Sequence, residues 1–199
     1  MNVNTRDSHI QQRSSRRNIM SANEREPVKD QGYIQVYTGN GKGKTTAALG
    51  LALRAICAGK KVFMGQFIKG MVYSELNAVQ WLPGLVIEQF GRDCFIRNNP
   101  TEEDTRIALQ GLERAREVLQ AGDYDVVILD EINVALYYQL FTQEAVLALM
   151  AEKPTHVELV LTGRYAPETI MNAADLVTEM KEVKHYYTKG VNARKGIEN

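Results

Sequence analysis

The sequence predicts an α/β protein whose mostly parallel sheet is flanked by helices. Short apolar segments typical of strands alternate with segments of helical periodicity from residue 33 to residue 180. One apolar segment, DVVILD at 125–130, is continuous, as in a strand that is buried on both faces of a parallel sheet. This alternation implies right-handed crossovers and helices on both faces of the sheet.

Each element follows from its local pattern. Strands are expected at 33–38, 61–67, 85–90, 125–130, 157–162 and, as a sheet edge, 176–180. Helices are expected at 46–58, 74–82, 101–120 and 167–174, with one or two more across 134–150. The helix at 101–120 opens with TEED, which resembles a capping box. We expect Cys57 and Trp81 to be packed.

Composition indicates a folded protein with balanced charge. The chain has 199 residues, 44% of them hydrophobic and 24% charged, with 24 basic and 24 acidic residues. This balance argues against a general nucleic-acid or membrane-surface partner. The longest apolar run is interrupted by Arg54 and is too short to cross a bilayer. Cys57 and Cys94 lie far apart and match no metal spacing, so we expect free thiols in a soluble, cytoplasmic protein.

Two terminal segments each allow two interpretations. Residues 1–30 are polar, with six Lys or Arg and four Asp or Glu, and form either a disordered tail or a segment that folds over a ligand. The last twenty residues carry five Lys or Arg and two Glu, and form either a solvated tail or a cover for a ligand. The folded domain is expected at 31–199.

The strongest functional motif is TGNGKGKTT at 38–46, between a predicted strand and a predicted helix. Glycines let consecutive backbone N–H groups turn inward around a phosphate, and the helix that follows adds its free N–H groups and dipole. The lysine places a positive charge on the terminal phosphates, and the threonine after it supplies a hydroxyl for Mg²⁺. The predicted nucleotide-binding residues are Gly39, Asn40, Gly41, Lys42, Gly43, Lys44, Thr45 and Thr46.

The spacing of this loop departs from the common pattern G-x-x-x-x-G-K-[ST]. Its first glycine would stand at position 38, which is Thr38, and Gly41 is an extra glycine. We therefore do not assume the usual pose of the nucleotide.

Two further motifs follow predicted strands. Asp130 and Glu131 end the strand DVVILDE, where they predict carboxylates for Mg²⁺ at the carboxyl edge of the sheet; the alternative is an acidic pair that starts a helix. Arg164 follows the strand that ends in LTGR, where it would reach a phosphate; the alternative is an arginine in a surface loop.

Together these motifs closely resemble those of one family, the P-loop ATP:corrinoid adenosyltransferases of the CobA/CobO/BtuR type. The matching segments are YTGNGKGKTTAALG at 37–50, GKKVFMGQFIKG at 59–70, VVILDEIN at 126–133, LTGR at 161–164 and the tail from 183 to 198. The resemblance covers about residues 32–199 and includes the unusual spacing of the glycines.

The resemblance implies a RecA-like fold and transfer of the 5′-deoxyadenosyl group of ATP to the cobalt of a reduced corrinoid, with release of triphosphate. It also implies a homodimer, Mg²⁺ or Mn²⁺, a reduced flavoprotein as electron donor, and a segment 1–30 that covers the corrinoid. Lys44, Thr45 and Glu131 would be the catalytic residues. Two alternatives stay open, an ordinary P-loop ATPase or kinase and a non-enzymatic nucleotide- or corrinoid-binding protein.

One family feature is not matched. Members carry a Phe-x-Trp pair after the third strand, which displaces the lower axial ligand of cobalt. This chain has Phe95 and Ile96 at that place, so Phe95 is the predicted corrinoid contact. The choice of corrinoid is left open.

Overall fold

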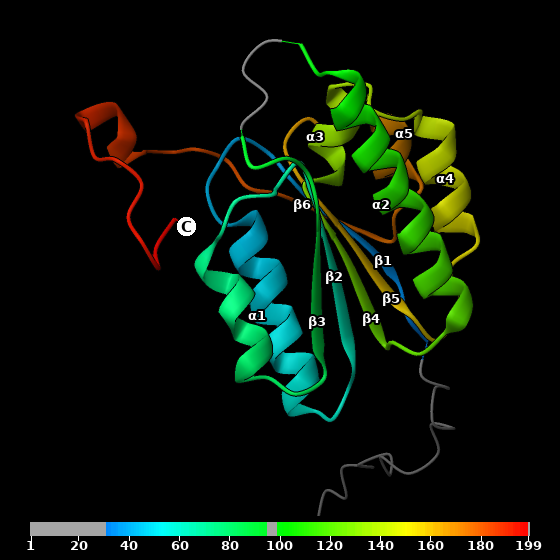
Figure 1. Ribbon diagram of the computed structural model, residues 1–199. Helices are drawn as coiled ribbons and strands as arrows, with labels where there is room; N and C mark the ends of the chain where they lie inside the picture. The colour runs from blue at the N-terminus through cyan, green and yellow to red at the C-terminus, as the bar shows by residue number, and fades with distance from the viewer. Residues whose placement is uncertain (1–30, 95–98, 199) are drawn as a thin grey trace, which may run out of the picture.

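The computed structural model describes residues 31–94 and 99–198, and these form one six-stranded parallel sheet with helices on both faces (Figure 1). The strands are β1 (Ile34–Thr38), β2 (Val62–Phe67), β3 (Leu85–Phe90), β4 (Val126–Asp130), β5 (Glu158–Thr162) and β6 (Leu176–Glu179). Their order is β3-β2-β4-β5-β1-β6. The predicted α/β class is confirmed, and all six expected strands are present.

One face of the sheet is covered by α1 (Lys44–Cys57) and by the 3-10 helix η1 (Ser74–Gln80). The buried residues Ala48, Ala52 and Ala55 form one stripe along α1. Because alanine is small, this stripe lets the helix lie close to β2, β4 and β5. The N-terminus of α1, with the glycine loop before it, is thereby held at the carboxyl edge of the sheet.

The other face is covered by α2 (Glu102–Ala121), α3 (Ile132–Tyr137), α4 (Gln143–Ala151) and α5 (Glu168–Asn172) (Figure 1). The predicted capping box of α2 is confirmed, because Thr101 accepts a hydrogen bond from the Asp104 N–H and Asp104 accepts one from the Thr101 N–H. The expected helix at 74–82 is the 3-10 helix η1.

Two side chains that were expected to be packed are exposed. Cys57 is the last residue of α1 and lies off its alanine stripe, so it is exposed rather than packed. Trp81 follows η1 and is 78% exposed, because the residues that pack there are Ala78 and Leu82. An apolar side chain at or just after the end of a helix need not face the sheet, so the apolar character of these two residues did not predict their burial.

The parallel register brings the ends of the strands together. Gln66 of β2 pairs with Asp130 of β4, and Tyr37 of β1 pairs with Thr162 of β5. The loops that follow β1, β2, β4 and β5 therefore meet at one edge of the sheet. Among the described helices, none is long and apolar enough to cross a membrane.

Two glycines allow the loops after β2 and β3 to pack closely against each other. A Cβ atom at Gly70 would lie 2.3 Å from the Gly91 carbonyl oxygen, and one at Gly91 would lie 2.4 Å from the Ile68 carbonyl carbon. No side chain fits at either position, so backbone packs directly on backbone where the two loops meet, beside Lys69.

We predict that Gly91→Ala lowers the free energy of unfolding by about 1–3 kcal/mol, because the new methyl group would overlap backbone that has no room to move. The matched control is Gly50→Ala on the exposed side of α1, where nothing lies within 4 Å of the added Cβ. There alanine should raise stability by about 0.5–1 kcal/mol. Urea unfolding of both variants checks this; equal effects would contradict the close packing at Gly91.

Candidate active site

The glycine loop between β1 and α1 forms a cradle with an ammonium group at its centre. Lys44 is 6% exposed, and its Nζ donates to the carbonyl oxygens of Gly39 and Gly41, each at 2.8 Å. Burial lowers the pKa of Lys44, and Arg164 adds to this effect, while Glu131 and Asp130 oppose it. Gly43 caps α1 with a positive φ of 119° and no side-chain bond, so the first N–H groups of the helix remain available to an anion.

Two glycines of the loop are required by a neighbouring segment of chain. Gly41 donates its N–H to the Met180 carbonyl at 2.7 Å, and a Cβ atom there would lie 2.7 Å from the same oxygen. A Cβ at Gly39, whose φ is 94°, would lie 2.4 Å from it. The segment after β6 therefore supports the loop from outside, and this explains the extra glycine at position 41.

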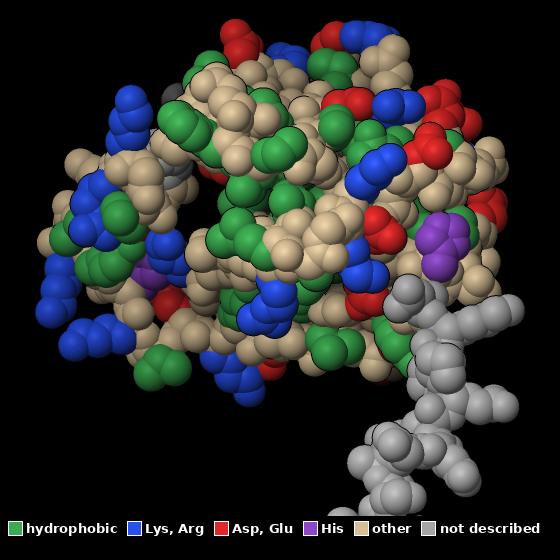
Figure 2. Space-filling view, turned by 90° about the horizontal axis from the view of Figure 1, so that it is seen from below, with side chains coloured by type: hydrophobic (Ala, Val, Ile, Leu, Met, Phe, Trp, Pro, Cys, Tyr) green, Lys and Arg blue, Asp and Glu red, His purple; other side chains and the backbone are tan. Residues whose placement is uncertain are grey.

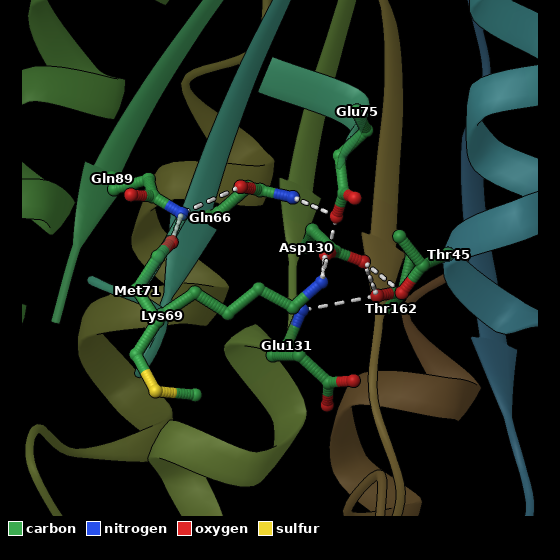
Figure 3. Close-up of polar contacts among 9 residues, drawn as sticks. All are labelled: Thr45, Gln66, Lys69, Met71, Glu75, Gln89, Asp130, Glu131 and Thr162. Atoms are coloured by element: carbon green, nitrogen blue, oxygen red, sulfur yellow. Dashed lines mark hydrogen bonds and ion pairs between the residues drawn. The ribbon is translucent and has the colours of Figure 1, made fainter. Parts of the chain in front are cut away.

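Asp130 is the centre of a buried polar network at the carboxyl edge of the sheet (Figure 3). It is fully buried, and its Oδ1 accepts hydrogen bonds from Thr45 Oγ1 at 2.9 Å and from Thr162 Oγ1 at 2.7 Å. Its Oδ2 is 2.8 Å from Lys69 Nζ. Asp130 thus connects the first turn of α1, the end of β5 and the loop after β2.

Lys69 is the cation of this network. Burial works to lower its pKa, but the adjacent Asp130 carboxylate outweighs burial, and the net pKa lies above the ordinary value. Its Nζ also lies 3.5 Å from Glu75, which accepts a hydrogen bond from the buried Gln66 amide (Figure 3). The network therefore continues through Gln66 into β2.

Glu131 lies next to Asp130, but its carboxylate lies outside the Asp130 network. Its backbone is left-handed, with φ 59°, and its N–H donates to Thr162 Oγ1 at 3.0 Å. In Figure 3 its carboxylate points away from the Asp130 network. Burial and the Asp130 charge raise the pKa of Glu131, while Lys69, Lys44 and Arg164 oppose the rise.

In front of Asp130 lies a cleft of about 470 Å³. Its lining includes the glycine loop with Thr45 and Thr46, and also Lys69 and Glu75. Glu131 and Arg164 also line it, as do His185 and residues 196–198 of the C-terminal tail. The cleft therefore combines several cations with carboxylates, which suits a polyphosphate bound with a divalent cation.

The C-terminal tail reaches this cleft over the glycine loop. Lys42 Nζ donates to the Ile197 carbonyl at 3.0 Å, and the tail is braced internally by Arg194 and Tyr186, which both contact Glu198. Figure 2 shows the tail at one side of the molecule with Lys and Arg side chains gathered on it. The structure places His185 and residues 196–198 of the tail at the cleft, while most side chains of the tail are exposed to solvent.

Comparison with known proteins identifies the family. Residues 30–199 match the family described as ATP:corrinoid adenosyltransferase BtuR/CobO/CobP. This chain belongs to that family. Similar proteins include the corrinoid adenosyltransferase of Escherichia coli (strain K12), 34% identical over 96% of this chain and 98% of the relative, and the corrinoid adenosyltransferase CobA of Salmonella typhimurium (strain LT2), 32% identical over the same shares. A corrinoid adenosyltransferase of Sinorhizobium is 38% identical over 85% of this chain and 81% of the relative.

The structure of this ATP:corrinoid adenosyltransferase family member brings together most of the predicted site residues. Gly41, Lys42, Gly43, Lys44, Thr45, Thr46, Glu131 and Arg164 line the cleft, and Asp130 lies directly behind it. Gly39 contacts the Lys44 ammonium, and Asn40 lies between the two glycines whose carbonyls bind it. Phe95, Ile96 and residues 1–30 lie outside the described residues, so the prediction of a corrinoid contact at Phe95 stays a prediction.

Lys69 and Thr162 also belong to the site, although neither was predicted from the sequence. Both belong to segments that had been singled out, FIKG and LTGR. Lys69 stands two residues after the end of β2, as Glu131 stands one residue after β4, so the same argument about strand ends would have found it. Among non-glycine residues with a positive φ, Ile68, Glu131 and Tyr165 follow β2, β4 and β5. Strained backbone of this kind gathers at functional sites.

We predict that Glu131→Gln stabilises the protein at neutral pH while it impairs function. A folded-state pKa above the ordinary 4.5 means that the folded state binds more protons, so wild-type stability falls as pH rises from about 4.5 through the raised pKa. The glutamine side chain cannot ionise, so the variant does not lose stability in this way as pH rises. Unfolding curves between pH 4 and 8 should show a flatter profile for the variant; a profile that falls as steeply as that of the wild type would contradict the raised pKa.

Proposed function

We propose that the cleft binds ATP and aligns it for transfer of its 5′-deoxyadenosyl group to the Co(I) of a reduced corrinoid. Membership of the ATP:corrinoid adenosyltransferase family supports this reaction. The observation that carries the proposal is the buried Lys44 ammonium, which lies inside a glycine loop at a helix N-terminus without a side-chain cap and lines one cleft together with Glu131 and Arg164.

The reaction requires no proton transfer. The electron pair of Co(I) forms a bond to the 5′ carbon of the ribose while the bond from that carbon to the α-phosphate oxygen breaks. The triphosphate departs with that electron pair and gains negative charge. The protein must therefore hold the two reactants in line and stabilise the charge on the leaving group.

The residues of the cleft suit this task. The glycine loop and the first turn of α1 offer N–H groups to the triphosphate. Lys44 lies at the centre of the loop, and Lys42 and Arg164 also line the cleft. These three cations would share the charge of the triphosphate as it leaves, and Lys44 would exchange its two carbonyl partners for phosphate oxygens.

The donor set also fits Mg²⁺ or Mn²⁺ bound together with phosphate. Among the described residues no group of three or more His, Cys, Asp or Glu could hold a metal by itself. Thr45 supplies a hydroxyl and Asp130 and Glu131 supply carboxylates, and Mg²⁺ is usually held by one or two carboxylates together with phosphate oxygens. Both Asp130 oxygens are occupied by protein donors, so Glu131 would be the direct ligand and Asp130 would hold Thr45 in place. Bound there, the cation would neutralise charge on the triphosphate.

The remaining parts of the hypothesis concern partners, location and the corrinoid contact. A homodimer, a reduced flavoprotein as electron donor and a segment 1–30 that covers the corrinoid carry over from the family resemblance. A cytoplasmic location is consistent with Cys57 and Cys94, which are both free and exposed. Phe95 would contact the corrinoid from the loop after β3.

We predict that Lys44→Ala lowers the rate of adenosyl transfer by at least about a hundredfold, because it removes the central cation of the triphosphate site. The assay mixes enzyme, ATP, Mg²⁺, a cobalamin and a strong chemical reductant, and follows the spectrum of the light-sensitive cobalt–carbon product. Lys60→Ala, on the opposite edge of the sheet, is the control with unchanged rate.

Phosphorus NMR of the wild-type reaction should show intact triphosphate. ADP and phosphate would instead indicate an ordinary ATPase or kinase, and wild-type turnover by the Lys44 variant would contradict the proposed triphosphate site.

A further inference from the structure

Asn133 is a fully buried amide whose hydrogen-bonding capacity is unused. It lies in the first turn of α3, two residues after Glu131, and is 0% exposed. Within the described part of the chain, neither its side-chain nitrogen nor its oxygen has a hydrogen-bond partner. Buried polar groups are nearly always bonded, because otherwise they lose their water and gain nothing in return. The other buried residues of α3 (Ile132, Ala135 and Leu136) are apolar, so packing alone does not explain an asparagine here.

The turn that carries Arg164 packs directly on this residue. A Cβ atom at Gly163 would lie 3.0 Å from the Asn133 Cβ and 3.1 Å from the Val134 nitrogen. Gly163 has a φ of 129° and Tyr165 has a φ of 63°, so both neighbours of Arg164 adopt a left-handed backbone. The turn is thus close to Asn133 and is held in a conformation that costs free energy.

Arg164 connects this turn to the cleft. Its side chain is exposed on the cleft wall, and its charge reaches both Lys44 and Glu131, since it lowers the pKa of each. A triphosphate in the glycine loop would attract the guanidinium, and the backbone of Gly163 and Tyr165 would have to move with it. Asn133 is the buried polar side chain against which that backbone would move.

We propose that Asn133 is a positioning residue for Arg164, and that its amide binds the backbone of the Gly163–Tyr165 turn only when nucleotide is bound. This inference rests on the proposed role of Arg164 as a triphosphate ligand. It accounts for the unused amide, because the partner of Asn133 arrives with the nucleotide. It also accounts for Gly163, since a side chain there would separate the turn from Asn133.

The test measures stability and ATP affinity together. In Asn133→Leu the unpaired amide is replaced by an apolar group, so the melting temperature without nucleotide should rise, while calorimetry should show ATP with Mg²⁺ binding about tenfold more weakly. Asn133→Ala is a second variant, in case leucine is too large for the site. The control is Gln66→Leu, which removes a buried amide whose nitrogen and oxygen are both bonded and should lower the melting temperature.

A double-mutant cycle with Arg164→Ala tests whether Asn133 affects ATP binding through Arg164. If Asn133 acts through Arg164, its substitution should weaken ATP binding in the wild-type background and change it little in the Arg164→Ala background. An equal loss in both backgrounds, or unchanged affinity in the first, would overturn the inference. A melting temperature that falls as far as that of Gln66→Leu would also overturn it, because Asn133 would then already be bonded in the free protein.

The cycle also separates this inference from the proposed function. If Arg164→Ala binds ATP as tightly as the wild type, the role of Arg164 fails and the inference fails with it. If Arg164→Ala binds weakly and Asn133 shows no coupling, only the inference fails.

Discussion

The ion pair between Lys69 and the buried Asp130 carboxylate holds the carboxyl edge of the sheet together. A charge without exposure to water must be paired and fully hydrogen-bonded, and Asp130 meets this requirement with Lys69, Thr45 and Thr162. These partners come from the loop after β2, from α1 and from β5. The position of the glycine loop relative to the rest of the site therefore depends on one carboxylate.

The two adjacent carboxylates have separate roles because their surroundings differ. Both oxygens of Asp130 accept hydrogen bonds from the protein, whereas the Glu131 carboxylate points away from this network and has a raised pKa. This division leaves Glu131 to interact with a bound cation while Asp130 fixes the hydroxyl of Thr45. It suits a reaction in which the nucleophile needs no base and the protein mainly stabilises a leaving group.

The sequence was sufficient to predict the strands, most of the helices and some of the residues that follow the strand ends. Glu131 and Arg164 were found because residues after parallel strands gather at one edge. The place of Lys69 just after β2 pointed to the same edge, but its pairing with Asp130 could not be predicted, because it depends on β2 lying beside β4 and local pattern does not reveal the order of strands. The extra glycine at position 41 likewise reflects contact with Met180, far away in the chain. The packing expected for Cys57 and Trp81 was wrong because an apolar residue at a helix end need not face the sheet.

The most direct test of this account is a double-mutant cycle on the free energy of unfolding with Lys69→Met and Asp130→Asn. Lys69→Met alone leaves a buried charge without its cation and should cost about 3–5 kcal/mol. In the double variant the charge is absent, so much of this cost should disappear, and the double variant should be more stable than Lys69→Met. If the effects of the two substitutions simply add, Lys69 and Asp130 are not coupled, and the ion pair does not organise the site.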